Sequence, residues 1–256
     1  MRRCRAFDTI HNMKILLFIL LGLIGLVIAV ILFVIICSLF INPHKEYGTN
    51  SPFYRWLLNF CTGAAVFILR IRIHTTGLEK VPEGRFLLVG NHRSNFDPIL
   101  TWWVLRDRQL AFLSKEENFH VPAFGRIIRK CGFLEIDRSD PRASILTLKK
   151  AADMIKQDIV SMMIYPEGTR SKECVLLPFH DGIFRVAQMA DVPIVNVAIR
   201  GTEQIHKRYI RHRTDVYIDF VDFIPKEEVK KMRTHEIGER IRNGLLTTLE
   251  GEKSNE

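Results

Sequence analysis

The feature that most constrains this chain is a run of 27 residues, 15–41, that contains no charged side chain. As a helix rising 1.5 Å per residue, the run would extend about 40 Å, longer than the roughly 30 Å hydrocarbon core of a bilayer. A secretory signal has a shorter apolar region with a small-residue cleavage site, and a soluble core helix of this length normally keeps a polar face. The run therefore predicts a membrane-embedded helix.

A second apolar segment, residues 56–69, is too short to cross a bilayer alone. Four basic residues precede the long run and two, Lys45 and Arg55, lie between the two segments, which favours a cytoplasmic N-terminus. The five cysteines are scattered without a C-x-x-C pair, as is typical of reduced thiols in a cytosol-facing protein. We therefore expect residues 1–69 to form a membrane hairpin that enters and leaves on one side. The protein would lie at the cell membrane, with residues 70–256 facing the cytoplasm.

Residues 70–256 have the pattern of one α/β domain. Short apolar runs predict strands, and amphipathic patterns between them predict helices. The strands are expected at 70–74, 86–89, 110–113, 132–136, 161–165, 192–199 and 216–220, and the helices at 98–106, 121–130, 142–157, 182–190 and 226–249. Alternation of strands with helices indicates a mainly parallel central sheet flanked by helices.

A cluster of turn-forming residues directly follows the predicted strand 86–89 and contains His92 and Asp97. Five residues along a helix is a rotation of about 140°, so the two side chains meet only if the segment is a turn, for which Ser94 and Asn95 are suited. A carboxylate on one ring nitrogen leaves the other free to accept a proton, as a general base requires. From spacing alone, a capping Asp beside an incidental loop His is the alternative.

A second polar cluster, Glu167-Gly168-Thr169-Arg170, follows another predicted strand. The glycine permits close approach of backbone to a ligand, and arginine suits two-pronged binding of phosphate. An ordinary surface turn is the alternative. Arg138, which follows a third predicted strand, is a weaker candidate because a surface ion pair accounts for it better.

Four sequence blocks, in order, resemble those of the 1-acyl-sn-glycerol-3-phosphate acyltransferases, within the wider glycerolipid acyltransferase family. The resemblance covers about residues 70–199, roughly half of the chain. Each block alone is weak, but four in the family's order are specific. The blocks are Asn91-His92 with Asp97 after four residues, Gly132 with Ile136-Asp137-Arg138, Tyr165-Pro166-Glu167-Gly168-Thr169-Arg170, and Val192-Pro193-Ile194-Val195.

The resemblance implies transfer of a fatty acyl group from an acyl thioester to the sn-2 hydroxyl of 1-acyl-sn-glycerol 3-phosphate, giving phosphatidic acid. It implies that His92 is the general base and that Asp97 orients it. It implies no metal or other cofactor, with coenzyme A or acyl-carrier protein carrying the donor and the lipid bilayer as a partner. The acceptor-binding residues that it implies are Arg138, Glu167, Gly168, Thr169 and Arg170.

One departure from the family leaves the acceptor open. Family members usually have lysine in a Phe-Lys-x-Gly element, where this chain has Phe179-His180-Asp181-Gly182. His180 is therefore a candidate for acceptor binding, either as an imidazolium paired with Asp181 or directly on phosphate. Glycerol 3-phosphate or another lysophospholipid is the alternative acceptor.

The formal charge of +9 indicates an anionic partner. Residues 200–213 are strongly basic, but no nucleic-acid recognition motif accompanies them, so we expect no nucleic-acid partner. Anionic lipid or an acidic acyl carrier fits the membrane segment better, and a plain solvated face fits equally well. A lipase using Ser94 is disfavoured because G-x-S-x-G is absent from the sequence. A membrane-anchored protein without enzymatic activity would leave the four blocks unexplained.

Overall fold

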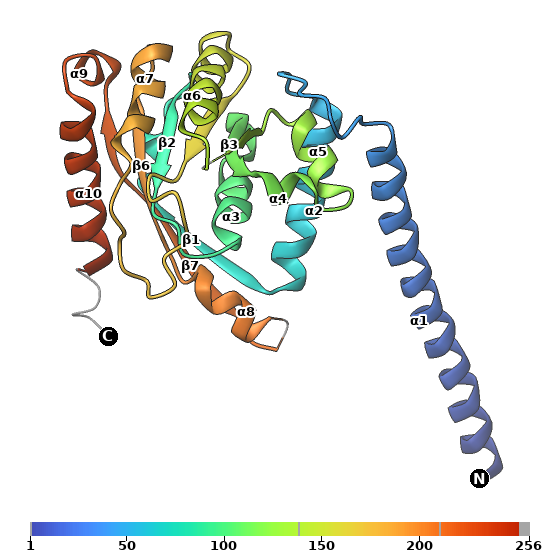
Figure 1. The fold of residues 1–256 in the computed structure, drawn as a ribbon. Coiled ribbons are helices and arrows are strands. Elements are labelled where there is room, and N and C mark those ends of the chain that lie inside the picture. Colours follow the sequence, from blue (N-terminus) through green and yellow to red (C-terminus); the bar gives the residue numbers. More distant parts are fainter. Residues whose placement is uncertain (1, 138, 210, 251–256) are drawn as a thin grey trace.

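A seven-stranded sheet with helices on both faces forms the body of the molecule in the computed structural model (Figure 1). The structure describes residues 2–137, 139–209 and 211–250, with side chains from residue 12 onward. The strand order is β1-β7-β6-β2-β5-β3-β4. The strands are β1 (Ile71–Thr76), β2 (Leu87–Gly90), β3 (Leu110–Lys115), β4 (Leu134–Ile136), β5 (Ser161–Ile164), β6 (Ile194–Arg200) and β7 (Thr214–Ile224).

The prediction of a mainly parallel sheet is confirmed. Every neighbouring pair of strands is parallel except β6 and β7, which are antiparallel, so β1 and β7 run against the other strands. A 3-10 helix (Thr202–Gln204) and α8 (Ile205–Arg208) lie between β6 and β7 in the chain. An antiparallel pair needs no long crossover, whereas a parallel pair would.

The helices of the body follow the predicted pattern in the main, but they include short helices at 116–119 and 205–208 that the sequence did not predict. Besides α8 they are α3 (Phe96–Val104), α4 (Glu116–Phe119), α5 (Phe124–Lys130), α6 (Pro141–Lys156), α7 (Arg185–Ala190), α9 (Lys226–Val229) and α10 (Thr234–Glu250). The helix expected at 121–130 begins only at Phe124. The helix expected at 226–249 is interrupted, because the Glu236 carboxylate accepts the Arg233 N–H at 2.7 Å and caps a new helix there.

The central strand β2 is buried on both faces, as its unbroken apolar run predicts. Leu87 and Val89 pack into the core beneath α6, α7 and α10. Leu88 points to the opposite face and packs with residues of α2 (Pro52–Ile68), α3 and α5. Two apolar cores therefore hold the strand in place, and its carboxyl end is fixed between the two helical layers.

The N-terminal helix α1 (Arg2–Leu39) projects from the body, and α2 runs in the opposite direction beside the sheet (Figure 1). Among the described residues, α1 is the one helix long and apolar enough to cross a membrane, with 28 residues from Asn12 to Leu39. In contrast, α2 buries Leu57, Leu58 and Thr62 against the body and exposes Phe67 on its other side. The second helix of the expected hairpin thus packs on the α/β domain.

A buried arginine fastens α2 to the body. Arg55 donates to the carbonyl oxygens of Leu110, at 3.1 Å, and of Cys131, at 3.4 Å. Its Nε donates to Asn50 at 2.7 Å, and the guanidinium lies 4.3 Å from the Trp102 ring centroid. Burial lowers the pKa of Arg55 to about 10, which leaves the side chain charged at neutral pH. Asn50, which accepts the bond from Arg55 Nε, belongs to the loop that leads back to α1.

A membrane hairpin over residues 1–69, as expected from the sequence, predicts that the N-terminus and the α/β domain lie on the same side of the membrane. After the five native cysteines are replaced by alanine, single cysteines at Arg5 and at Lys226 should both react with an impermeant maleimide from the cytosolic side only. Labelling is to be compared in intact and inverted vesicles. Reaction of the two positions from opposite sides would mean that α1 crosses once and that the hairpin is wrong.

Candidate active site

Polar side chains gather where four strands of the sheet end. His92 follows β2, Lys115 is the last residue of β3, Glu167 follows β5 and Thr202 follows β6. In sheets with parallel strands, these carboxyl ends face one edge, where ligands commonly bind. The four residues are far apart in sequence and are brought together by the strand order β6-β2-β5-β3.

The buried carboxylate of Asp97 is the centre of this cluster, with none of its surface exposed. Its Oδ2 lies 2.8 Å from His92 Nδ1 and also accepts the backbone N–H groups of Arg93, at 2.6 Å, and Ser94, at 2.7 Å. Its Oδ1 accepts the hydroxyl of Thr202. Since the carboxylate accepts from every partner, His92 must donate its Nδ1 proton, which leaves the lone pair on Nε2.

The loop that carries His92 is fixed to the two strands beside it. A side chain at Gly90 would place its Cβ 2.6 Å from the Val197 carbonyl oxygen, so only glycine permits this approach to β6. The Asn91 side chain then bonds to both backbone groups of Ile199, at 2.9 and 2.8 Å. On the other side, the His92 carbonyl accepts the N–H of Ser171 at 2.8 Å. The imidazole is therefore presented by a rigid turn, as the turn-forming residues predict.

Glu167 and Tyr165 support the same imidazole. One Glu167 oxygen accepts the His92 backbone N–H at 2.7 Å and the other accepts that of Leu177 at 2.9 Å. Burial raises the pKa of Glu167, and these two backbone donors act in the opposite direction. The Tyr165 ring stacks on the His92 ring, with centroids 4.1 Å apart. Both oxygens of Glu167 thus bond to backbone, which gives this predicted acceptor ligand a positioning role in the structure.

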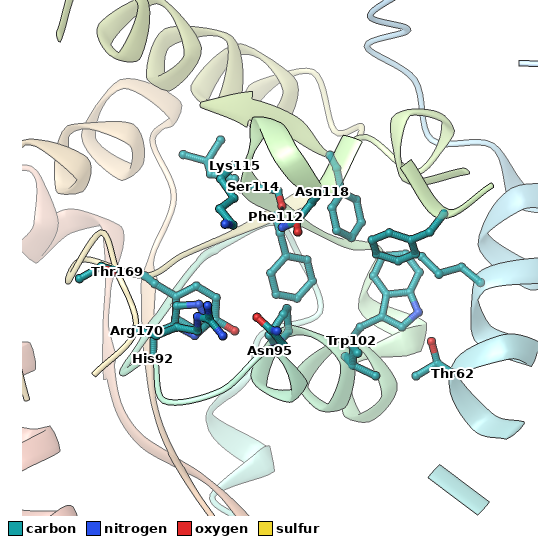
Figure 2. A pocket seen from close by; sticks show the side chains of 17 residues that line it. Thr62, His92, Asn95, Trp102, Phe112, Ser114, Lys115, Asn118, Thr169 and Arg170 are labelled. Atoms are coloured by element: carbon teal, nitrogen blue, oxygen red, sulfur yellow. Dashed lines mark hydrogen bonds between the residues drawn. The ribbon is translucent and has the colours of Figure 1, made fainter. Parts of the chain in front are cut away.

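A cavity of about 360 Å³ opens at His92 and extends between α2, α3 and β3. Figure 2 shows His92, Thr169 and Arg170 at one end and Trp102 and Thr62 at the other, with Phe112 between them. The lining away from His92 is mostly apolar and includes Leu58, Ile99, Phe124 and Phe133. Such a cavity suits a hydrocarbon chain whose polar end lies at His92.

The structure brings two of the four residues of the second cluster to this cavity. Thr169 and Arg170 are exposed and line its mouth. Gly168 has φ +65°, and a Cβ there would lie 3.0 Å from the His180 ring, so His180 lies beside this turn without lining the cavity. Arg138 lies outside the described residues.

Asp181 is turned away from His180. Its Oδ2 lies 3.1 Å from His235 Nδ1 on α10, and this hydrogen bond, with Glu239 nearby, raises the pKa of His235. The Asp181 carboxylate also occupies the space where a Cβ on Gly238 would be, 2.4 Å from its Oδ1. The expectation that Asp181 pairs with His180 is therefore wrong, since α10 holds that carboxylate.

Sequence reasoning missed Lys115 and Thr202. Lys115 lines the cavity over the same end as His92 and Arg170 (Figure 2). Thr202 is fully buried and bonds to Asp97 across 105 positions of sequence. Their positions in the sequence could have identified them, because each residue lies at or just after the carboxyl end of a strand that was expected to be parallel to β2.

The surroundings of Ser94 are not those of a catalytic nucleophile. It is buried, its hydroxyl accepts the N–H of Phe96 at 3.2 Å, and its own backbone N–H bonds to Asp97. The Ser94 hydroxyl thus serves the turn, in agreement with the missing G-x-S-x-G motif.

Comparison with known proteins identifies similar sequences and a similar fold. A family model described as "Acyltransferase" matches residues 72–200, half of the chain. A 1-acyl-sn-glycerol-3-phosphate acyltransferase of Streptococcus pneumoniae is 30% identical over 211 residues, covering 80% of this chain and 75% of the relative. One from Saccharomyces cerevisiae is 26% identical, covering 84% and 70%. One from Limnanthes douglasii is 31% identical over 55% of this chain, which spans only 49% of that relative.

A solved structure has a similar fold. The crystal structure of the 1-acyl-sn-glycerophosphate acyltransferase PlsC from Thermotoga maritima superposes with a TM-score of 0.65 at 22% sequence identity. The match covers 78% of this chain and 81% of the other. At this identity the likeness concerns the fold, and it includes most of the α/β body described above.

The bond from Thr202 to Asp97 predicts a stability effect. Thr202→Val keeps the volume but leaves a buried carboxylate oxygen without a donor, and should lower the free energy of unfolding by about 2 kcal/mol. Thr202→Ser keeps the donor and should lose about 1 kcal/mol or less. The measurement is denaturant unfolding of the full chain in detergent micelles.

Thr214 provides a matched control for this comparison. It is also buried, and its hydroxyl makes no hydrogen bond within the part of the chain that the structure describes. Thr214→Val should therefore be neutral or slightly stabilising. Equal losses for valine at Thr202 and at Thr214 would contradict the bond to Asp97.

Proposed function

This chain belongs to the acyltransferase family and is an acyltransferase, and we propose that it transfers a fatty acyl group to the sn-2 hydroxyl of 1-acyl-sn-glycerol 3-phosphate, giving phosphatidic acid. The donor is an acyl thioester of coenzyme A or of acyl-carrier protein. The observation that carries the proposal is the His92–Asp97 pair at the polar end of an apolar cavity. The names of the relatives support the same acceptor.

In the proposed reaction His92 acts as the general base. Its Nε2 takes the proton of the acceptor hydroxyl as the oxygen attacks the thioester carbonyl. The tetrahedral intermediate collapses, the carbon–sulfur bond breaks, and the thiolate leaves with the proton that His92 returns. Asp97 holds the ring in the required tautomer and stabilises the imidazolium. Because a thioester is already activated, the reaction as proposed uses no metal or other cofactor.

The apolar part of the cavity holds the acyl chain in this proposal. A chain placed between Trp102, Phe112 and Thr62 keeps its thioester near His92, since these residues extend from the polar end toward α2. Burial of each methylene there contributes about 0.8 kcal/mol. The cavity therefore binds the donor along its acyl chain and places the thioester carbonyl near His92 for attack.

The acceptor phosphate binds at the mouth of the cavity, where Arg170 and Lys115 supply positive charge. Arg170 is exposed, so its guanidinium is free to turn toward a phosphate, and arginine suits two parallel bonds to it. His180 lies beside the turn at Gly168 and adds a donor near this position. Gly168 and Thr169 shape the turn, and Arg138 is retained as a further candidate from the sequence.

We further propose that residues 1–69 hold the enzyme at the cell membrane with its α/β domain toward the cytoplasm. The apolar surface of α1 and the basic N-terminal residues support this arrangement. The free thiols of Cys61, Cys131 and Cys174 support the reducing compartment. The lysophospholipid acceptor is then reached from the bilayer itself.

The proposed function predicts the loss of transfer when the base is removed. His92→Ala should lower kcat about 10³-fold, and Asp97→Asn at least about 10²-fold, since base catalysis has this size. The assay uses purified full-length protein, labelled acyl-CoA or acyl-carrier protein, and a panel of acceptors that includes glycerol 3-phosphate. Expression and detergent unfolding of the variants serve as controls. Near-normal transfer by the His92 variant, or transfer only to an acceptor other than 1-acyl-sn-glycerol 3-phosphate, would contradict the proposal.

A second prediction concerns the acceptor phosphate. Arg170→Lys keeps the charge but loses the two-pronged geometry, so the KM for 1-acyl-sn-glycerol 3-phosphate should rise about tenfold with little change in the KM for donor.

His180→Lys adds a fixed charge beside Gly168 and should leave the KM for 1-acyl-sn-glycerol 3-phosphate unchanged or lower it, most visibly above pH 7. Arg185→Lys, at an exposed position on α7, is the control. Loss of transfer at every pH in His180→Lys would show that His180 does not stand in for a lysine.

A third prediction concerns the length of the acyl chain. Thr62→Phe fills the end of the cavity away from His92, so the preferred donor should become shorter by at least two carbons, each worth about fourfold in kcat/KM. The measurement is competition between donors of graded length. Phe60→Leu, on the exposed face of the same helix, should leave the preference unchanged. An unchanged preference in Thr62→Phe would mean that the chain binds elsewhere.

A further inference from the structure

A second hollow, of about 660 Å³, lies at the C-terminal end of α2 and shares no lining residue with the cavity at His92. We name it the basic hollow. Three arginines and a floor of apolar side chains form it, together with Gly63. The arginines are Arg70, Arg72 and Arg213, and the apolar residues are Val66, Phe67, Ile68, Ile71 and Trp103.

The pairing of β1 with β7 concentrates positive charge at this hollow. Ile71 pairs with Thr214 in parallel register, so Arg70 and Arg213 lie side by side one position earlier. Like charges at neighbouring positions of a sheet are destabilising. Arg70 also has φ +54°, an uncommon backbone conformation for a residue with a side chain. All three arginines are exposed. Asp215, which pairs with Arg72 in the strand register, is a carboxylate beside them, and the three guanidiniums leave an excess of positive charge that an anion complements.

The apolar floor identifies what kind of anion fits. Phe67 is 83% exposed and Ile68 is 58% exposed, directly beside the arginines. The exposed face of α2 continues from them through Phe60 and Trp56, whose rings stack. A ligand that matches this surface has a negatively charged head and a long apolar body. An acidic carrier protein matches the charge alone.

We propose that the basic hollow binds the phosphate headgroup of an anionic phospholipid and thereby seats the α/β domain on the membrane surface. Phosphate is held by the three arginines, and the lipid's apolar part lies along Phe67 and Ile68. This site goes beyond the reaction proposed above, because it takes no part in acyl transfer.

The hollow shares two helices with the cavity at His92, which links lipid binding to the site. On α2, Thr62 lines the cavity whereas Gly63 lines the hollow. On α3, Trp102 lines the cavity, and Trp103 packs over Gly63, where a Cβ would lie 2.7 Å from its ring. A lipid in the basic hollow therefore rests on the helices that wall the acyl cavity, and anionic lipid should raise the rate of transfer.

The test compares two charge-matched variants of the full chain. The first replaces Arg70, Arg72 and Arg213 by glutamine. The control replaces Arg142, Lys149 and Lys231, three exposed cations elsewhere on the body, by glutamine. Each protein in zwitterionic detergent is mixed with phosphatidylglycerol and phosphatidylcholine in equal amounts, and the lipids retained are counted by native mass spectrometry. Transfer rates are measured in phosphatidylcholine vesicles with and without phosphatidylglycerol.

The parent and control proteins should retain phosphatidylglycerol in preference and should be activated by it. The hollow variant should lose both, with about fivefold weaker retention for each arginine removed. Its rate in phosphatidylcholine alone should match that of the parent, which separates failure of this site from failure of the proposed function. Phe67→Gln, a single change at the surface, should weaken retention of both lipids. It replaces the triple variant in this test if the triple variant does not fold.

Three results would overturn the proposal. The first is that the hollow variant retains phosphatidylglycerol as well as the parent does. The second is that its loss of retention and of activation is no greater than that of the control variant. The third is that the hollow variant keeps its preference for phosphatidylglycerol but binds acyl-carrier protein more weakly, which would assign the hollow to a protein partner.

Discussion

The requirement that a buried carboxylate find a donor for each of its oxygens governs the geometry of the site. Asp97 is completely enclosed, and an enclosed charge without partners is costly. Its donors come from two directions: the turn after β2, including His92, and Thr202 at the end of β6. Meeting this requirement closes the turn, orients the imidazole and links two strands in one step. The His92 imidazole is thus positioned by the same interactions that stabilise the local fold.

The same edge of the sheet combines a polar cluster with an apolar cavity, and this combination fits acyl transfer. The strands supply the polar groups, whereas α2 and α3 supply the apolar wall. Because Arg55 fastens α2 to the body, that wall has a defined position relative to His92. The exposed side of α2 faces outward with its aromatic residues, so one helix serves the cavity on one face and the proposed membrane contact on the other.

Local patterns in the sequence were sufficient for the buried strands, the long apolar N-terminal helix and the meeting of His92 with Asp97, because apolar runs and turn-forming residues act over a few positions. Contacts across the sheet were not predictable in the same way. The bond from Thr202 to Asp97 and the place of Lys115 depend on strand order, which one sequence does not specify. The pairing of Asp181 with His235 depends on how α10 packs, and the interruption before α10 depends on one side-chain cap.

The central claim is that Asp97 holds His92 with its proton on Nδ1 and its lone pair on Nε2. The most direct test is nitrogen NMR of the full chain in detergent, labelled with ¹⁵N-histidine, with the His92 signals identified by their loss in His92→Gln. The account predicts a protonated Nδ1 whose proton resonates far downfield, an unprotonated Nε2, and loss of this pattern in Asp97→Asn. A proton on Nε2 in the neutral ring, or a pattern that Asp97→Asn leaves unchanged, would contradict it.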